Sequence, residues 1–160
     1  MSSAQLVTDG PEATPIPTRF GPLGFASHQV WRAAQPLPGF EGLQRFGLIS
    51  VQAERPFVWL QSLDEAAVSF LLVPAASFGL HYPALGAETL PLVMVVLPQR
   101  AGEPLRAHRQ APLLFDAQTG QFAQHIVEDT EVQGDGQFTP RAAAPLPADF
   151  TARMLLLVAG

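Results

Sequence analysis

The chain has 160 residues, a net charge of −5 and no cysteine, and all nine of its basic residues are arginines. This length predicts one domain that can bury its own core. The lack of cysteine excludes disulfides, thiolate metal sites and cysteine nucleophiles. The scattered arginines argue against direct binding to nucleic acid, which requires a basic patch.

No stretch of the sequence approaches the roughly 20 apolar residues that a membrane-spanning helix requires. The first residues carry neither an early positive charge nor an apolar core of the kind found in secretory signals. We therefore expect a cytoplasmic protein that has no membrane partner.

The N-terminal residues 1–17 are polar and rich in proline, which predicts a flexible tail. Residues 18–131 contain the recurring short apolar runs of a single β-domain. Residues 132–160 form a C-terminal extension that begins in a polar, proline-rich stretch and is largely unassigned. Its apolar run Met154–Val158 is a candidate for an added edge strand, because such a run is costly to leave exposed.

Residues 37–64 are the most informative stretch of the chain. Its first residues are dense in proline and glycine, which predicts a tight corner. The runs Phe46–Val51 and Phe57–Ser62 are short, rich in β-branched or aromatic residues and bounded by turn residues, so they predict two neighbouring strands. We expect Phe40 and Trp59 to hold this corner to the core.

Further runs have the length and composition of strands: Val68–Val73, Leu90–Leu97, Leu113–Phe115 and Gln121–Val127. The last two are separated by Asp116–Gly120, which predicts a hairpin. Many short strands without a long amphipathic helix indicate an all-β, mainly antiparallel fold. We predict a small closed or partly closed β-barrel with few short helical turns, since closure removes exposed edges.

The titratable residues show no arrangement typical of catalysis or metal binding. The four histidines, at positions 28, 81, 108 and 125, lack the spacing of metal ligands. The acidic stretch that starts at Asp129 has Pro140 where a calcium loop requires a bidentate glutamate. We therefore predict no catalytic residue, no metal and no cofactor. A binding protein is favoured over an enzyme.

Several segments carry a further signal: TRFG (18–21), LPGFEGLQRF (37–46), PFVWLQSLD (56–64) and VSFLLVPAASF (68–78). In this order and separation they resemble the FliW family of flagellar assembly factors. The resemblance covers roughly residues 18–129. Positions 33–36 and His108 depart from the family pattern, so the chain resembles a divergent member.

The resemblance implies a non-enzymatic, β-barrel-like protein that binds cytoplasmic flagellin and also the RNA-binding translational regulator CsrA. On this resemblance we expect flagellin to occupy the factor while flagellin is abundant, and export of flagellin to release the factor to antagonise CsrA. An acidic barrel suits a partner with a basic surface. The free protein is expected to be a monomer. The alternative is a small-ligand-binding barrel in which Phe57, Trp59 and Phe70 line a cavity.

Polar side chains at strand ends and in turns are the candidates for partner binding. They comprise the polar end of the second strand of the corner, a tyrosine and an acidic cluster: Gln61, Ser62, Asp64, Tyr82, Glu128, Asp129 and Glu131.

Overall fold

The computed structural model of the chain describes residues 14–85, 90–96, 98–103, 105–134 and 146–158. The strands are β1 (Pro15–Ile16), β2 (Leu23–Gly24), β3 (Val30–Ala33), β4 (Arg45–Val51), β5 (Val58–Ser62), β6 (Ser69–Pro74), β7 (Leu90–Val96), β8 (Arg106–Ala107), β9 (Leu113–Asp116), β10 (Gln121–Gln124) and β11 (Leu155–Leu157). The helical turns are η3 (Ser27–Gln29), η4 (Gln52–Glu54), η5 (Ala75–Phe78), η6 (Asp129–Glu131) and α1 (Ala148–Thr151). The predicted all-β fold with few short helical turns is confirmed.

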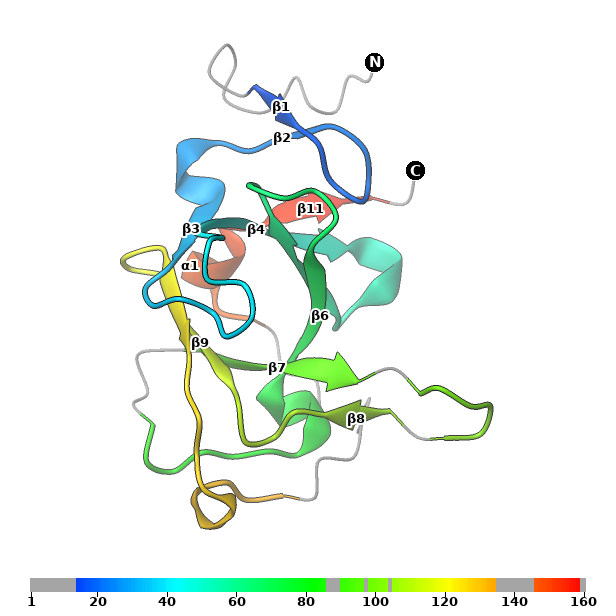
Figure 1. The fold of residues 1–160 in the computed structure, drawn as a ribbon, viewed down its shortest axis with the longest axis vertical. Coiled ribbons are helices and arrows are strands. Elements are labelled where there is room, and N and C mark those ends of the chain that lie inside the picture. Colours follow the sequence, from blue (N-terminus) through cyan, green and yellow to red (C-terminus); the bar gives the residue numbers. More distant parts are fainter. Residues whose placement is uncertain (1–13, 86–89, 97, 104, 135–145, 159–160) are drawn as a thin grey trace.

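Seven strands close into a barrel (Figure 1). The ring of hydrogen-bonded neighbours runs β4–β3–β10–β9–β7–β6–β5 and returns to β4, because β4 pairs with both β3 and β5. All pairings within the ring are antiparallel except that of β3 with β10, which is parallel. Closure removes the free edges that the same short strands would expose in an open sheet.

The corner and the two strands predicted for residues 37–64 are present. The Phe40 N–H donates to the Leu37 carbonyl oxygen at 2.8 Å. Between them, Gly39 has a φ of +84°, a left-handed conformation that favours glycine. After this turn β4 and β5 pair antiparallel with each other, with η4 between them in the chain. The prediction of a tight corner followed by two neighbouring strands is therefore confirmed.

The two aromatic residues expected to hold this corner to the core lie outside the barrel interior. Phe40 is 37% exposed and packs edge-on against Phe70, with ring centroids 5.1 Å apart. Trp59 is half-buried and lies on the outer face of β5, because its neighbours Val58 and Leu60 point inward and side chains alternate along a strand.

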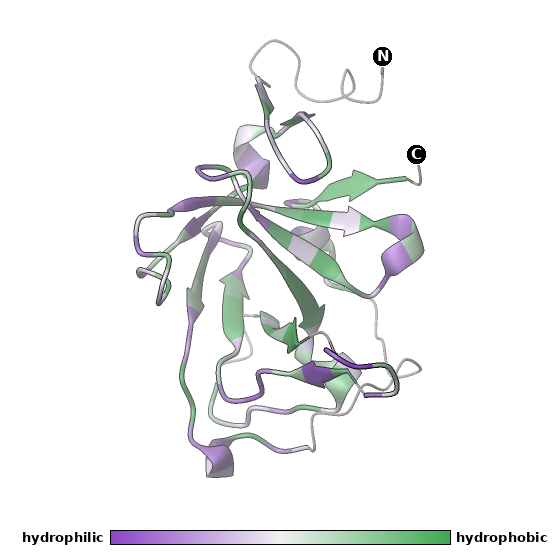
Figure 2. Cartoon of the chain, turned by 45° about the vertical axis from the view of Figure 1, so that its right-hand side comes forward, coloured by the Kyte–Doolittle hydropathy of each residue, from purple (hydrophilic) through white to green (hydrophobic). Residues whose placement is uncertain are grey.

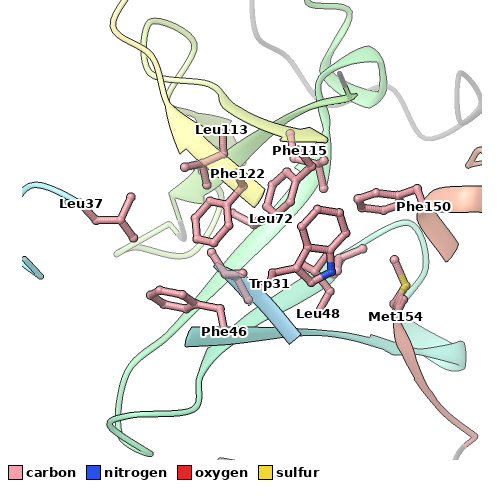
Figure 3. Close-up of a cluster of buried hydrophobic side chains, with 13 residues drawn as sticks. Trp31, Leu37, Phe46, Leu48, Leu72, Leu113, Phe115, Phe122, Phe150 and Met154 are labelled. Atoms are coloured by element: carbon pink, nitrogen blue, oxygen red, sulfur yellow. The ribbon is translucent and has the colours of Figure 1, made fainter. Parts of the chain in front are cut away.

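The barrel interior is filled with large apolar side chains around Trp31 (Figure 3). The Trp31 and Phe115 rings meet edge to face at 5.2 Å, and Phe115 stacks on Phe122 at 5.0 Å, both favourable arrangements for aromatic pairs. The buried members of the interior cluster are Trp31, Leu37, Phe46, Leu48, Val58, Leu60, Leu72, Leu92, Leu113, Phe115, Phe122, Phe150 and Met154.

The cavity suggested as an alternative finds no support in this packing. Phe70 packs against the interior cluster, Phe57 against a second cluster that includes Val73, and Trp59 against a third cluster. Three residues in three separate clusters do not line one cavity. The interpretation as a small-ligand-binding barrel is therefore wrong in the residues on which it depended.

The N-terminal residues cover the outer face of β4 and β5. β1 and β2 form a small antiparallel sheet, and Phe20 and Phe25 near it pack in the third cluster with Ile49 and Trp59. Gly47 allows this close approach, since a Cβ there would lie 2.3 Å from the Phe25 ring. β1, at Pro15–Ile16, lies within residues 1–17, the range that the sequence indicated as a tail. The rest of that tail, residues 1–13, lies outside the described residues.

The C-terminal extension contributes to both the core and the sheet. β11 lies within the run Met154–Val158, the candidate edge strand of the sequence, and pairs in parallel with Ile49–Val51 of β4. The preceding turn α1 inserts Phe150 into the barrel interior, where its side chain is 1% exposed. This insertion was not predicted. Residues 135–145 of the extension lie outside the described part of the chain.

Candidate partner-binding surfaces

The residues predicted to bind partners fall into two separate regions. The first is the β5–β6 turn, residues 61–68, near the top of Figure 1. The second is the acidic turn, Glu128–Glu131, which includes η6 and forms the bottom of Figure 1 and a hydrophilic tip in Figure 2. Tyr82 belongs to the second region through its contact with Arg109. The predicted residues do not form one continuous surface.

Gln61 and Ser62, which the sequence indicated as candidates for partner binding, are fully buried, so neither side chain is exposed to a partner. The Gln61 amide donates to the carbonyl oxygens of Ser62 and Ala66, each at 3.0 Å, and to that of Val68 at 3.3 Å. Its side-chain oxygen accepts the Arg19 N–H at 3.1 Å. A buried amide must be hydrogen-bonded, and here it holds the turn and the N-terminal segment together.

The Ser62 hydroxyl also acts inside the turn. It accepts the N–H groups of Asp64 at 3.1 Å and Glu65 at 2.9 Å. Serine often caps turns in this way, and the segment between β5 and β6 is a turn of this kind.

Asp64 stabilises the corner through hydrogen bonds to residues at the start of β4. One carboxylate oxygen accepts the N–H groups of Gln44 and Arg45, and the other accepts the Arg45 Nε–H, all at 3.0 Å. We call these three residues the clasp. Partial burial alone would raise the pKa of the Asp64 carboxyl, but the hydrogen bonds from Arg45 and Gln44 outweigh burial and lower the pKa.

An arginine and two aromatic rings lie beside the β5–β6 turn. The Arg19 guanidinium carbon lies 3.9 Å from the Trp59 ring centroid, and Phe20 meets Trp59 edge-on at 6.0 Å. Arg19 also donates to the Ser69 hydroxyl at 3.2 Å, and the Trp59 indole donates to Glu54 at 3.0 Å. Arginine and tryptophan are common at binding hot spots. Sequence reasoning did not single out Arg19, because its neighbours here are distant in sequence.

Tyr82 is buried, and its hydroxyl donates to the Arg109 carbonyl oxygen at 2.6 Å. Burial raises the pKa of Tyr82 to about 12, and the nearby Arg109 charge only partly opposes this shift. The neighbouring His81 exchanges two backbone hydrogen bonds with Gln133, at 2.9 and 2.8 Å. The Tyr82 hydroxyl is therefore used within the fold, in its hydrogen bond to Arg109, and is not available to a partner.

The acidic turn exposes the carboxylates that the sequence indicated. The Glu131 side chain accepts the Glu128 N–H at 2.7 Å, which closes the turn. Asp129 is 75% exposed and forms an ion pair with Arg109. Three carboxylates and one guanidinium leave a local charge of −3 + 1 = −2.

Arg109 is the structural centre of this region, and sequence reasoning missed it. Besides its ion pair with Asp129, its guanidinium donates to the carbonyl oxygens of Gly134 at 3.1 Å and Val132 at 3.3 Å. Because the planar guanidinium group carries five N–H donors, a single arginine can bind several backbone carbonyl oxygens at once. The only feature of the sequence that distinguished Arg109 was that it lies close to Arg106, which does not indicate a structural role.

Metal binding and membrane crossing are two further possibilities for the described part of the chain. Among these residues, no group of three or more histidine, cysteine, aspartate or glutamate side chains is placed to hold a metal ion. The helices within the same residues are all too short to cross a membrane.

The fold and its surfaces define a small β-barrel protein with a filled interior and an exposed acidic turn at one end. The model of the protein family described as FliW protein matches residues 15–135. The chain belongs to the FliW family. This membership confirms the resemblance seen in the sequence and the prediction of a non-enzymatic protein.

Individual relatives agree with this assignment. The flagellar assembly factor FliW of Leptospira biflexa serovar Patoc is 29% identical over 123 residues, which cover 69% of this chain and 80% of that protein. The flagellar assembly factor FliW of Desulfitobacterium hafniense is 30% identical over 139 residues, covering 79% of this chain and 91% of that protein. A crystal structure of the flagellar assembly factor FliW superposes with a TM-score of 0.63 at 22% identity, over 79% of this chain and 97% of that one, which supports the fold.

Proposed function

We propose that this protein is a cytoplasmic flagellar assembly factor that binds flagellin and antagonises a CsrA-type translational regulator by exchanging one partner for the other. The observation that carries the proposal is the family match over residues 15–135, together with relatives named flagellar assembly factors. Binding of flagellin would withdraw the protein from the regulator, and export of flagellin would release it.

The acidic turn is the surface on which we place the RNA-binding regulator. Glu128, Asp129 and Glu131 are exposed, and the whole chain has a net charge of −5. An RNA-binding protein needs a basic surface to neutralise phosphates, and opposite charges on two proteins accelerate and orient their association. The β5–β6 turn is less suited to this role, because its polar side chains bind the protein's own backbone.

Calorimetric titration of the full chain with the host's flagellin and CsrA tests the proposal. We expect both partners to bind, and saturation with flagellin to weaken the binding of CsrA. Glu128→Arg should weaken CsrA binding by about tenfold, because it replaces attraction with repulsion at the interface. Glu65→Arg makes the same charge change on the exposed β5–β6 turn and should leave CsrA affinity nearly unchanged.

Two results would count against the proposal. Failure of the folded protein to bind either partner would remove its basis. Equal weakening by Glu65→Arg and Glu128→Arg would show that net charge, and not the acidic turn, governs the association.

A further inference from the structure

The C-terminal residues 146–158 lie beyond the family match, which ends at residue 135, yet they complete one end of the barrel. We call residues 146–158 the C-terminal latch. The latch contacts the barrel in three ways: through an aromatic anchor, through an arginine and through a short strand. Each contact is made to residues inside the family match.

The aromatic anchor is Phe150. Its ring centroid lies 5.7 Å from that of Trp31 and 5.9 Å from that of Phe115, and its side chain is 1% exposed. In Figure 3 the latch approaches from one side of the interior cluster and directs Phe150 and Met154 into it. The latch therefore places one large aromatic side chain among the buried residues of the barrel interior.

Arg153 binds the barrel through backbone groups. Its guanidinium donates to the carbonyl oxygens of Ala117 at 2.5 Å, His28 at 3.2 Å and Gln118 at 3.4 Å. Its own carbonyl oxygen accepts the Trp31 indole N–H at 3.0 Å. A buried indole N–H requires a partner, and the latch provides it.

β11 adds main-chain pairing to the edge of β4, and it does so over three residues only. Leu156 is 50% and Val158 66% exposed. Among the described residues, no strand pairs with the other side of β11. Leu155 and Leu157 pack against the third cluster, but a three-residue edge strand makes few contacts and can separate locally while the rest of the fold stays intact.

We propose that the C-terminal latch occupies, in cis, a site for an extended segment of flagellin and is displaced when that segment binds. An aromatic anchor in a pocket followed by strand addition to a free sheet edge is a recurring mode of peptide recognition. The latch indicates the chemistry of the ligand: a large aromatic side chain, then an apolar stretch able to form a strand. The partner's identity rests on the proposed function, whereas the existence of the site does not.

The first experiment tests the site without flagellin. A fluorescent peptide of residues 146–158 is titrated into the full-length Phe150→Ala variant, in which the tethered segment has lost its anchor. Since a tethered segment competes at a high effective concentration, we expect saturable binding to this variant and at least about tenfold weaker binding to the wild type. A peptide with alanine in place of its phenylalanine is the control and should not bind.

The second experiment follows the latch while flagellin binds the wild-type chain. Hydrogen exchange of the β11 amides should accelerate on saturation with flagellin. Arg153→Ala weakens the latch and should raise the affinity for flagellin by about three- to tenfold, because a larger fraction of the protein has the site open. Arg100→Ala, in the loop between β7 and β8, is the matched control and should leave this affinity unchanged.

Each outcome decides one part of the inference. Absence of peptide binding to both Phe150→Ala and Arg153→Ala, with circular dichroism showing that both are folded, would overturn the site. Binding of flagellin with unchanged exchange of β11, or with weaker affinity for Arg153→Ala, would overturn displacement and make the latch an integral part of the barrel. Peptide binding without flagellin binding would support the site and reject flagellin as its ligand, together with the proposed function.

Discussion

The β5–β6 turn and the acidic turn use similar residues in opposite ways. In the β5–β6 turn, Asp64 accepts three hydrogen bonds and its side chain is 27% exposed, while the polar residues before it are buried. In the acidic turn, Arg109 holds the backbone, and the carboxylate of Asp129 is 75% exposed. One aspartate therefore stabilises the fold, and the other remains accessible to a partner.

This difference shows that a polar cluster is better judged by what its hydrogen bonds reach than by its composition. A side chain bound to the backbone of its own chain cannot be removed without loss of stability. An exposed carboxylate can change partners at small cost to the fold. We therefore expect substitutions in the β5–β6 turn to affect stability first, and those in the acidic turn to affect binding first.

The largest effect is expected at Gln61. Gln61→Leu removes the partner of the Arg19 N–H and of three carbonyl oxygens, and should lower the free energy of unfolding by roughly 2–4 kcal/mol. Urea denaturation measures this change. Gln121→Leu, at an exposed position of β10, is the control and should shift stability by less than about 0.5 kcal/mol. Equal effects of the two substitutions would contradict the structural role of Gln61.

Arg109 should produce the next largest effect, because its guanidinium binds the backbone that follows the acidic turn. Arg109→Ala removes the hydrogen bonds to Val132 and Gly134 and should cost about 1–2 kcal/mol. Hydrogen exchange should accelerate at the paired amides of His81 and Gln133. Arg106→Ala, on β8, should leave these two amides protected, and acceleration in both variants would point to a general effect of charge.

Asp64→Asn should lower stability by about 1 kcal/mol at neutral pH, because the charged hydrogen bonds of the clasp are weakened. The pKa of Asp64 is lower in the folded chain than its ordinary value of 3.8, so the unfolded chain binds the proton more readily. The stabilisation is therefore fully present above pH 3.8 and is lost as the pH falls through the folded pKa. Thermal denaturation from neutral to acidic pH should show the two proteins converging in acid. A constant difference at every pH would contradict this account.

The smallest effect on stability is expected at Glu128. Its side chain is exposed, so its charge contributes little to the stability of the fold. Glu128→Gln should change the free energy of unfolding by less than about 0.5 kcal/mol. Thermal denaturation of the variant beside the wild type checks this value. A loss comparable to that of Gln61→Leu would erase the distinction between the two turns.

The positions of the longer strands along the chain and the corner at residues 37–64 could be predicted because local patterns determine them. Turn residues and short apolar runs mark each reversal, and the hairpin that Asp116–Gly120 connects follows the same logic. Closure of the barrel was indicated only in general terms. The parallel pairings of β3 with β10 and of β4 with β11 join segments far apart in the chain, which a local pattern does not report.

The candidate surfaces could be predicted in part, for a related reason. Exposure of Glu128 and Asp129 follows from their charge, since unpaired carboxylates are rarely buried. Burial of Gln61 could not be predicted, because its amide is satisfied by Arg19, 42 positions earlier, and by the turn after it. Arg109 was missed for the same reason: its contacts at residues 129–134 come from a separate segment.

The two tryptophans of the chain report on its two ends separately. Trp31 is buried against the C-terminal latch through Phe150 and Arg153, whereas Trp59 is half-buried beneath Arg19 of the N-terminal segment. Indole fluorescence responds to the polarity around the ring, so Trp59→Phe leaves an intrinsic optical probe of the latch alone. Release of the C-terminus could then be timed in a stopped-flow instrument on otherwise unlabelled protein.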